Sequence, residues 1–312
     1  MTLLESNSAF AYPFLREIFF FFLIYIINVA CCYSSQGFFN IGRYTGKYIY
    51  ISTDSVYEVC KEPPHWGPLR EEDAVRPTDP VERETLASRD SYGDRKLACE
   101  EVLETEANSQ RVWWMSLRLP DVIGPRDNSN RFWTYLIWLR FGDVIGKRIS
   151  LPPHLKGRKL SFVHSEDVGR LILQLVKMSP HHKFQQAYNL AFRETVTLEE
   201  LINMMAKTLG ISEVNYDRET TGSYLYPSVT RGPVNITKAE KNLNWKPMPI
   251  EEAVEKTVQF YEYAMRAPEF RRQRNALINK LIPGEKKEIF KKKFKKIYRI
   301  DYQEAIDVKD EL

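Results

Sequence analysis

Cysteine is scarce in this sequence, which argues against folds held together by metal or disulfide bonds. The 312 residues include four cysteines, Cys31, Cys32, Cys60 and Cys99, and no C-x-x-C pair. A structural zinc site or a disulfide framework needs several cysteines at short, repeated spacings. We therefore expect neither a zinc module nor a disulfide-rich scaffold, and we predict no metal site.

A strong excess of one charge is also missing from most of the chain. Lys and Arg number 45 and Asp and Glu 41, which gives a formal net charge of +4. Residues 286–299 alone carry eight Lys or Arg and one acid, a net charge of +7, so the rest of the chain has a net charge of −3. Any attraction to a polyanion is therefore expected from this C-terminal segment and not from the body of the protein.

No hydrophobic run in the sequence has the length of a typical transmembrane helix. Residues 18–29 contain one strongly polar residue, and with the flank to Tyr33 the run is about 16 residues, against the roughly 20 that span a bilayer. The run has the length of a signal-peptide core, but Glu5, Arg16 and Glu17 before it make a poor positive segment. A signal or anchor, a buried strand, and foreign sequence from a wrongly assigned gene start all stay open.

The chain ends in Lys309, Asp310, Glu311 and Leu312, which match the retrieval signal of the endoplasmic reticulum. This signal acts only on a chain that enters the secretory pathway, and an acidic, polar C-terminus is the ordinary alternative. The sequon at Asn235 adds little, because Asn or Thr before a helix is also a common cap.

Strand-like and helix-like patterns alternate through the middle of the chain, and hydrophobic residues make up 43% of the sequence. Thr197 and Glu200 form a T-x-x-E capping box that predicts a helix start. Residues 61–90 are rich in Pro and charge and show no clear period. Alternation over about 220 residues is typical of an α/β fold with a mostly parallel sheet. Strands are predicted at 47–52, 112–119, 160–164 and 187–190, and helices at 91–105, 132–139, 166–178, 237–243 and 249–264.

Two segments carry residue types suited to acid–base chemistry. Thr53 and Asp54 follow the first predicted strand in S-T-D-S-V-Y, and ligands of open α/β sheets bind at such strand ends. Tyr92 and Lys96 lie four residues apart on one predicted helix face, where an ammonium group can favour the phenolate of a tyrosine with an ordinary pKa of about 10. Together they could move a proton on or off an alcohol or carbonyl while hydride moves elsewhere. The ordinary alternative for the first segment is a polar cap between a strand and a loop. For the second segment it is a Tyr/Lys pair on the solvent-exposed face of a helix.

A third segment, L-R-L-P-D-V-I-G-P at residues 117–125, is a strand that enters a Pro- and Gly-containing loop. It again stands at the carboxyl end of a predicted strand, and a simple chain reversal is its ordinary alternative. In this order the three segments resemble the extended short-chain dehydrogenase/reductase family, the NAD-dependent epimerase/dehydratase group. Residues 162–168, F-V-H-S-E-D-V, and 187–190, A-Y-N-L, resemble further motifs of the family, and residues 71–77 resemble its substrate loop.

The resemblance implies roles for individual residues of this chain. Tyr92 is implied as the general acid/base, Lys96 as the group that lowers its pKa and holds the cofactor ribose, and Thr53 as a hydrogen-bond partner of the reacting oxygen. Pro120 and Val122 are implied to line the nicotinamide of NAD or NADP.

Three further residues are expected to contact the substrate because they lie in loops beside this site: Asp54, Arg126 and Asn130. The implied substrate is a nucleotide-sugar or another hydroxyl or carbonyl compound. The resemblance favours a cytoplasmic location and is compatible with a homodimer. The lumen of the endoplasmic reticulum is the alternative location.

The glycine-rich T-G-x-x-G-x-x-G segment of this family has no counterpart in the sequence. Gly37, Gly42 and Gly46 have a different spacing and no preceding nucleotide-binding strand. Such glycines let the backbone approach the cofactor pyrophosphate, so cofactor binding by this chain and the choice between NAD and NADP stay open. Since the match starts at the family's fifth strand, we expect an incomplete Rossmann-like parallel sheet flanked by helices, with a smaller C-terminal α/β substrate domain. Either the gene prediction is incomplete, or residues 19–29 cover the sheet edge.

Three regions and two classes of function follow from these patterns. Residues 1–40 form a hydrophobic segment unlike the family, residues 41–265 resemble the family, and residues 266–312 form a basic helical tail. Within this tail, the spacing of Phe290 and Phe294 suggests an amphipathic helix. That helix could bind RNA or an anionic membrane surface, or it is a solvated face. An NAD(P)-dependent enzyme is the first class. The second is a non-catalytic nucleotide- or RNA-binding member of the same fold, since the stretch from residue 122 to 132 is similar to the chloroplast stem-loop-binding branch.

Overall fold

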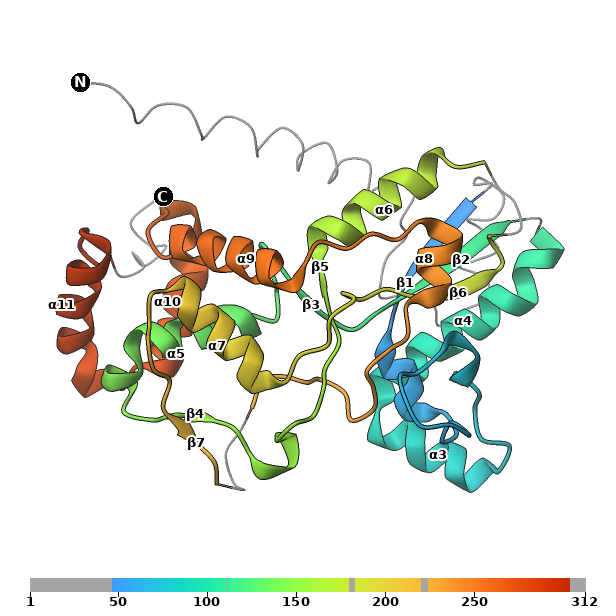
Figure 1. Cartoon of the computed structure of the whole chain (residues 1–312), viewed down its shortest axis with the longest axis horizontal. Helices are drawn as coiled ribbons and strands as arrows, with labels where there is room; N and C mark the ends of the chain where they lie inside the picture. The colour runs from blue at the N-terminus through green and yellow to red at the C-terminus, as the bar shows by residue number, and fades with distance from the viewer. Residues whose placement is uncertain (1–46, 111, 180–182, 220–223, 304–312) are drawn as a thin grey trace, which may run out of the picture. The chain divides into compact units, whose positions relative to one another are not determined.

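The computed structural model describes residues 47–110, 112–179, 183–219 and 224–303 (Figure 1). The hydrophobic run at 18–29, the glycines before residue 47 and the C-terminal tetrapeptide lie outside these residues. No helix of the described part is long and apolar enough to cross a membrane. The chain divides into two compact units. The first comprises Met1–Pro120, described from Lys47, with Glu166–Ala191 and Val229–Pro247, and the second comprises Asp121–Ser165, Phe192–Ser228 and Met248–Leu312.

In its described residues, the first unit is built on a three-stranded parallel sheet. Its strand order is β1 (Lys47–Thr53), β2 (Trp113–Leu119), β6 (Gln186–Asn189). The pairing sets Thr53 opposite Leu119, so that the carboxyl ends of β1 and β2 meet at the same edge. Strands buried on both faces are characteristic of parallel sheets covered by helices, and most residues of β1 and β2 are buried.

Helices α4 (Ser91–Gln110), α6 (Ser165–Lys177) and α8 (Thr237–Leu243) accompany this sheet, with the 3-10 turns η1 (Asp54–Val59) and η2 (Glu71–Asp73). These helices occur where the apolar periodicity predicts them. Helix α3 (Pro80–Arg89) was not predicted, because none of its residues is buried and it therefore has no apolar period. Its start is encoded locally: Asp79 accepts the backbone N–H of Glu82 at 2.8 Å and Pro80 occupies the first turn.

The part of the second unit that the structure describes combines five α-helices with two short parallel strand pairs. The pairs are β3 (Asp121–Ile123) with β5 (Phe162–His164), and β4 (Ile149–Ser150) with β7 (Tyr216–Asp217). The helices are α5 (Arg131–Ile145), α7 (Leu198–Thr208), α9 (Ile250–Ala264), α10 (Arg271–Leu281) and α11 (Lys287–Tyr298). The capping box at α7 is confirmed, since the side chains of Thr197 and Glu200 each accept the other's backbone N–H, at 3.1 and 2.6 Å.

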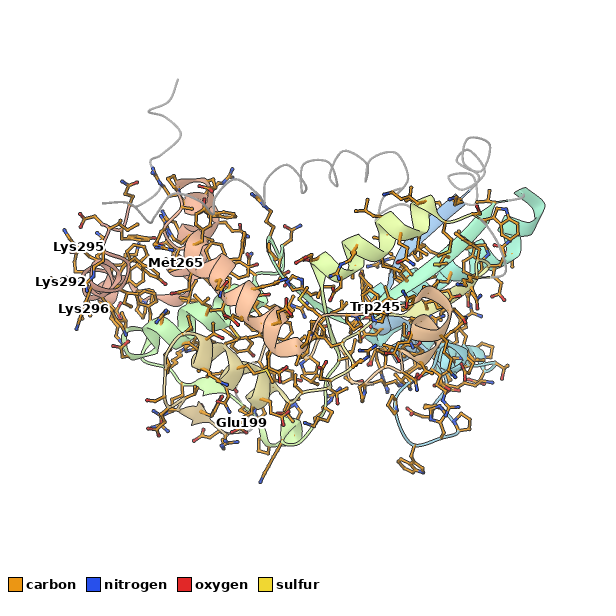
Figure 2. All side chains as sticks on the ribbon, turned by 45° about the horizontal axis from the view of Figure 1, so that its top comes forward. Glu199, Trp245, Met265, Lys292, Lys295 and Lys296 are labelled. Carbon is orange, nitrogen blue, oxygen red and sulfur yellow. The ribbon has the colours of Figure 1, made fainter. Side chains whose placement is uncertain are left out.

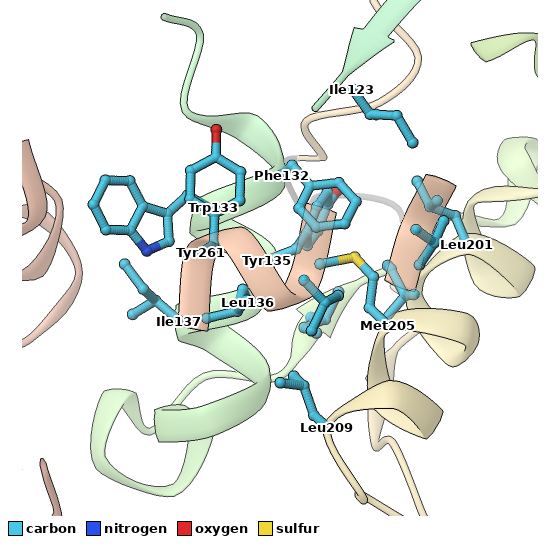
Figure 3. Packing of buried hydrophobic residues seen from close by; sticks show 14 of the residues in the cluster. Ile123, Phe132, Trp133, Tyr135, Leu136, Ile137, Leu201, Met205, Leu209 and Tyr261 are labelled. Atoms are coloured by element: carbon cyan, nitrogen blue, oxygen red, sulfur yellow. The ribbon is translucent and has the colours of Figure 1, made fainter. Parts of the chain in front are cut away.

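The core of the second unit is rich in aromatic side chains (Figure 3). Phe132 and Trp133 of α5 pack on Tyr261 of α9, with ring centres 6.0 and 5.1 Å apart. The basic C-terminal segment belongs to this core, because Phe290 and Phe294 of α11 lie 4.7 and 6.5 Å from the ring of Phe141. The fold class is therefore α/β, with parallel sheets flanked by helices, as the sequence predicts.

Candidate active site

The end of β1 places a hydroxyl beside a carboxyl group. Thr53 closes β1 and caps η1, where its Oγ1 accepts the backbone N–H of Ser55 at 3.2 Å. The same hydroxyl donates to Oδ1 of Asp54 at 3.4 Å. Thr53 and Asp54 are 8% and 6% exposed, so the strand and the turn hold both groups in a partly desolvated position.

Helix α4 lies very close to this turn because it contains Gly93. A Cβ atom on Gly93 would lie 2.2 Å from the carbonyl oxygen of Ser55. One turn later, Nζ of Lys96 donates to the carbonyl oxygen of Ile51 at 2.8 Å. The helix is thus anchored to the chain on both sides of Thr53, and it brings its first turns to the carboxyl end of β1.

Tyr92 and Lys96 lie on the same side of α4 and differ in their access to solvent. Nζ of Lys96 lies 5.7 Å from the ring centre of Tyr92 and 4.9 Å from that of Tyr50. Lys96 is 4% exposed, whereas Tyr92 is 46% exposed. The ammonium group is therefore the buried member of the pair and the phenol the accessible one.

The pKa of Tyr92 is raised above its ordinary value, opposite to the direction expected from a neighbouring ammonium group. Burial of the phenol is the largest cause, and the carboxylates of Asp54 and Asp90 add to it, while Arg95 acts in the other direction. Desolvation and two negative charges therefore set the direction of this pKa, since both disfavour the phenolate. The lowering effect expected of Lys96 stays a prediction. At neutral pH Tyr92 is a protonated phenol that can donate a hydrogen bond.

A buried ion pair, which the sequence did not reveal, joins α4 to β2. Nη2 of Arg118 lies 2.6 Å from Oε2 of Glu100, and both side chains are 6% exposed. Ser116 donates to the same carboxylate at 2.8 Å, and Nη1 of Arg118 donates to the hydroxyl of Tyr57 at 3.1 Å. Since Tyr57 belongs to η1, these bonds tie together the three elements that position Thr53 and Lys96.

Two sequence features could have indicated this pair. Glu100 follows Lys96 by four residues and so shares its helix face, and Arg118 is a charge inside an otherwise apolar strand. The network continues into β6, where Asn189 accepts the Tyr57 hydroxyl at 2.7 Å and donates to the carbonyl oxygen of Leu69 at 3.1 Å. The A-Y-N-L motif thus contributes a buried amide that connects β6 to η1.

The remaining predicted site residues are divided between the two units. Pro120 is buried after β2 and ends a segment of the first unit, whereas Val122, Arg126 and Asn130 belong to the second. Val122 is half-buried in β3 opposite Val163. The structure gathers Thr53, Asp54, Tyr92 and Lys96 within one unit. The roles of all eight site residues stay predictions.

Arg126 and Asn130 have local roles in the second unit. Both have positive φ, 63° and 57°. The guanidinium of Arg126 lies 5.0 Å from the ring centre of Phe270, and Oδ1 of Asn130 accepts Nε2 of Gln273 at 2.6 Å. Both side chains therefore fix the loop before α5 against η4 (Pro268–Phe270) and α10.

The described residues contain no group of three or more His, Cys, Asp or Glu that could hold a metal ion. Cys60 and Cys99 are buried free thiols. Burial raises the pKa of the Cys60 thiol to about 12, which makes it a poor nucleophile at neutral pH.

The chain belongs to the NAD dependent epimerase/dehydratase family, whose model it matches over residues 31–191. This range includes Thr53, Tyr92 and Lys96 together with the loop after β2. No curated protein matches the chain in the corresponding sequence comparison.

Solved structures of similar fold come from sugar-nucleotide enzymes. A UDP-glucose 4-epimerase from Thermotoga maritima is 19% identical, with a TM-score of 0.55, over 80% of this chain and 82% of that one. A UDP-glucuronic acid 4-epimerase from Bacillus cereus in complex with NAD is 19% identical, with a TM-score of 0.54, over 73% and 66%. A dTDP-glucose 4,6-dehydratase from Bacillus anthracis with NAD is 18% identical, with a TM-score of 0.52, over the same shares. At such identities the likeness shows the fold.

The donor groups at the end of β1 fit part of a nicotinamide dinucleotide. The buried Oγ of Ser52 has no hydrogen-bond partner among the described residues, and α4 brings the buried ammonium group of Lys96 to the carbonyl of Ile51, the residue before it. Hydroxyl and ammonium donors suit the hydroxyls of a ribose. The pyrophosphate would need backbone donors of a glycine-rich turn, and residues 47–303, so far as they are described, hold no such turn after a strand.

Proposed function

We propose that this protein is an NAD(P)-dependent enzyme of the epimerase/dehydratase type that acts on a nucleotide-sugar or a related hydroxyl or carbonyl compound. The observation that carries the proposal is the convergence of Thr53, Tyr92 and Lys96 at the carboxyl end of β1. Family membership supports the cofactor class. The solved structures of similar fold, which include two UDP-sugar 4-epimerases, support the substrate class.

Each side chain has a role that follows from its surroundings. Tyr92 is the exposed acid/base. Its raised pKa keeps the phenol protonated as the donor to a carbonyl oxygen that is being reduced. In the opposite direction its phenolate would take the proton of a substrate hydroxyl while hydride leaves the carbon for the oxidised dinucleotide. Thr53 is fixed by its cap. Its hydroxyl proton, which is donated to Asp54 at 3.4 Å, would turn to the same substrate oxygen. Lys96 holds positive charge beside the phenol, which limits the cost of a transient phenolate. The dinucleotide, when bound, supplies the hydride acceptor or donor.

Asp54 gives the proposed site a second titratable group. Its carboxyl is 6% exposed and is hydrogen-bonded to Thr53. Its negative charge disfavours the phenolate of Tyr92 and so helps to keep the phenol protonated.

The test compares the wild-type chain with Tyr92→Phe. Each protein is incubated with NAD⁺ or NADP⁺ and with UDP-glucose, UDP-glucuronic acid or dTDP-glucose, and the products are separated by chromatography. We expect turnover with one of these pairs, and a loss of about 100-fold or more in Tyr92→Phe, the range of a missing general acid. Dinucleotide binding, followed by fluorescence titration, should change less than threefold.

Tyr263→Phe is the matched control, because Tyr263 is 41% exposed and its hydroxyl donates to Glu269 on the surface. This variant should retain wild-type turnover. Full turnover in Tyr92→Phe would contradict the assignment of the acid. Dinucleotide binding with no turnover of any substrate would favour a non-catalytic nucleotide-binding protein.

A further inference from the structure

Helix α11 is amphipathic, and its apolar side is already used inside the second unit. Phe290, Phe294 and Tyr298 are 1%, 0% and 8% exposed. Their rings pack on one another and on Phe141, with Phe290 4.7 Å from Phe141 and Phe294 4.7 Å from Tyr298. The rotation of α11 is therefore fixed, and its opposite side must face solvent.

That opposite side is dense in lysine. Lys292, Lys295 and Lys296 are exposed and lie within about one turn of the helix (Figure 2). Like charges at spacings of three and four residues repel each other and destabilise a helix by a few tenths of a kcal/mol per pair. Lys295 and Lys296 interact favourably with the C-terminal end of the helix dipole, but Lys292 lies outside the last turn. The fold alone therefore does not account for this cluster.

The structure does little to neutralise these charges. Lys295 forms an ion pair of 2.8 Å with Asp301, and both side chains are largely exposed, at 62% and 75%, so the pair is weak and exchanges readily with other anions. Lys292 and Lys296 have no ion pair or hydrogen bond within the part of the chain that the structure describes. Positive charge at this end of the second unit is therefore available to a partner.

We propose that the exposed face formed by Lys292, Lys295 and Lys296 binds the phosphate backbone of a nucleic acid. Positions 292 and 296 are about 6 Å apart along the helix axis, at 1.5 Å per residue. A nucleic-acid strand carries one charge per roughly 3.4 Å of duplex axis, so the three ammonium groups match two or three successive phosphates. Because the contacts are to phosphates, binding is independent of base sequence.

A membrane surface fits the same face less well. Helices that bind membranes at the interface insert an apolar side between the lipid headgroups, and the apolar side of α11 is buried in the core. Lysines alone contribute about 1 kcal/mol each near an anionic surface. Since Ile289 near the helix start is 58% exposed, lipid vesicles form one arm of the test.

The proposal is tested by fluorescence anisotropy between about 25 and 200 mM salt. The probes are a labelled single-stranded RNA of about 20 nucleotides and a labelled DNA duplex of similar length. The variant is Lys292→Gln/Lys295→Gln/Lys296→Gln. We expect binding by the wild-type chain, a loss of about tenfold or more in the variant at low salt, and a log–log salt slope that is smaller by about 2 to 3. Circular dichroism should not change, and the thermal midpoint should change little, because the three side chains are exposed and each like-charge pair costs only a few tenths of a kcal/mol.

A control variant, Lys156→Gln/Lys207→Gln/Lys241→Gln, removes the same charge from exposed lysines on other elements. It should keep its affinity within about threefold of wild type, since net charge alone acts weakly at a distance in salt. Absence of nucleic-acid binding at 25 mM salt, or an equal loss in the control variant, would overturn the proposal. So would binding to phosphatidylserine vesicles, but not to nucleic acid, that depends on the three lysines.

Discussion

Gly93 of α4 lies directly against the carbonyl group of Ser55, so closely that a Cβ atom at residue 93 would be 2.2 Å from that oxygen. This contact places the start of α4 on the turn that follows β1. Tyr92 and Lys96 reach the end of β1 because the residue between them and the turn has no side chain. The geometry of the proposed site thus depends on a close approach of two backbones.

Gly93→Ala should therefore move α4 and destabilise the protein. Overpacking of this kind costs about 1–3 kcal/mol, and urea unfolding monitored by circular dichroism measures the change. Gly169→Ala is the matched control, since Gly169 also lies in a helix but a Cβ atom there would have no neighbouring atom within 4 Å. That variant should be neutral or more stable by up to about 1 kcal/mol. Equal stability of both variants would contradict the close contact.

Removal of one partner from the buried pair of Glu100 and Arg118 should be strongly destabilising. Glu100→Gln leaves the guanidinium of Arg118, 6% exposed, without its counter-charge, which costs about 3–5 kcal/mol. Replacing both residues by apolar side chains, as in Glu100→Leu/Arg118→Met, should recover part of the loss, because no unpaired charge then stays buried.

An exposed ion pair gives the reference for that measurement. Glu252→Gln breaks a pair with Lys256 of 3.1 Å between side chains that are 51% and 43% exposed, and it should cost no more than about 0.5 kcal/mol. The comparison uses urea unfolding under the same conditions. A Glu100→Gln protein as stable as Glu252→Gln would mean that the Glu100–Arg118 pair is open to water.

The ionisation of Tyr92 should respond to the charge of Asp54. The folded state raises the pKa of Tyr92 above 10.0, in part through the Asp54 carboxylate, so Asp54→Asn should lower it toward the ordinary value. Because the folded state holds the phenol proton more tightly than the unfolded chain, the contribution of Tyr92 to stability is complete below the ordinary pKa. It is lost as the pH rises through the raised pKa.

The measurement is a pH titration of ring-labelled tyrosine by NMR, with the Tyr92 signal assigned from its absence in Tyr92→Phe. Arg95→Gln provides a control of opposite sign, since Arg95 lowers the pKa of Tyr92 and its removal should raise it. A pKa of Tyr92 that is unchanged or higher in Asp54→Asn would show that the carboxylate does not act on the phenol.

Much of the local structure could be predicted from the sequence because it depends on neighbours along the chain. Apolar runs indicated β1 and β2 within one or two residues, and the T-x-x-E pattern indicated the start of α7. Helix α3 escaped prediction because it buries no side chain, so its apolar residues follow no period. The spacing of Tyr92 and Lys96 likewise indicated a shared helix face, because four residues make about one helical turn.

The charge environment of the site could not be predicted in this way. The spacing of Tyr92 and Lys96 suggested a lowered tyrosine pKa, whereas the fold buries the phenol and sets Asp54 and Asp90 near it. Asp54 begins η1 and Asp90 lies between α3 and α4, and the effect of both carboxylates depends on distances through space. Desolvation has no counterpart in a residue pattern, since it is a property of the packed state.

Local sequence therefore determined which segments are strands and helices, which residues could exchange protons, and which family the motifs resemble. The tertiary structure decided that α4 approaches the end of β1 closely at Gly93 and that Arg118 and Glu100 pair inside the first unit. It also decided that the aromatic side of α11 packs inward, so that its lysines face outward. Periodicity and capping act between residues a few positions apart, so they can be recognised in the sequence. Burial, ion pairing and close backbone contact involve residues that are distant in sequence, so these interactions form only when the chain has folded.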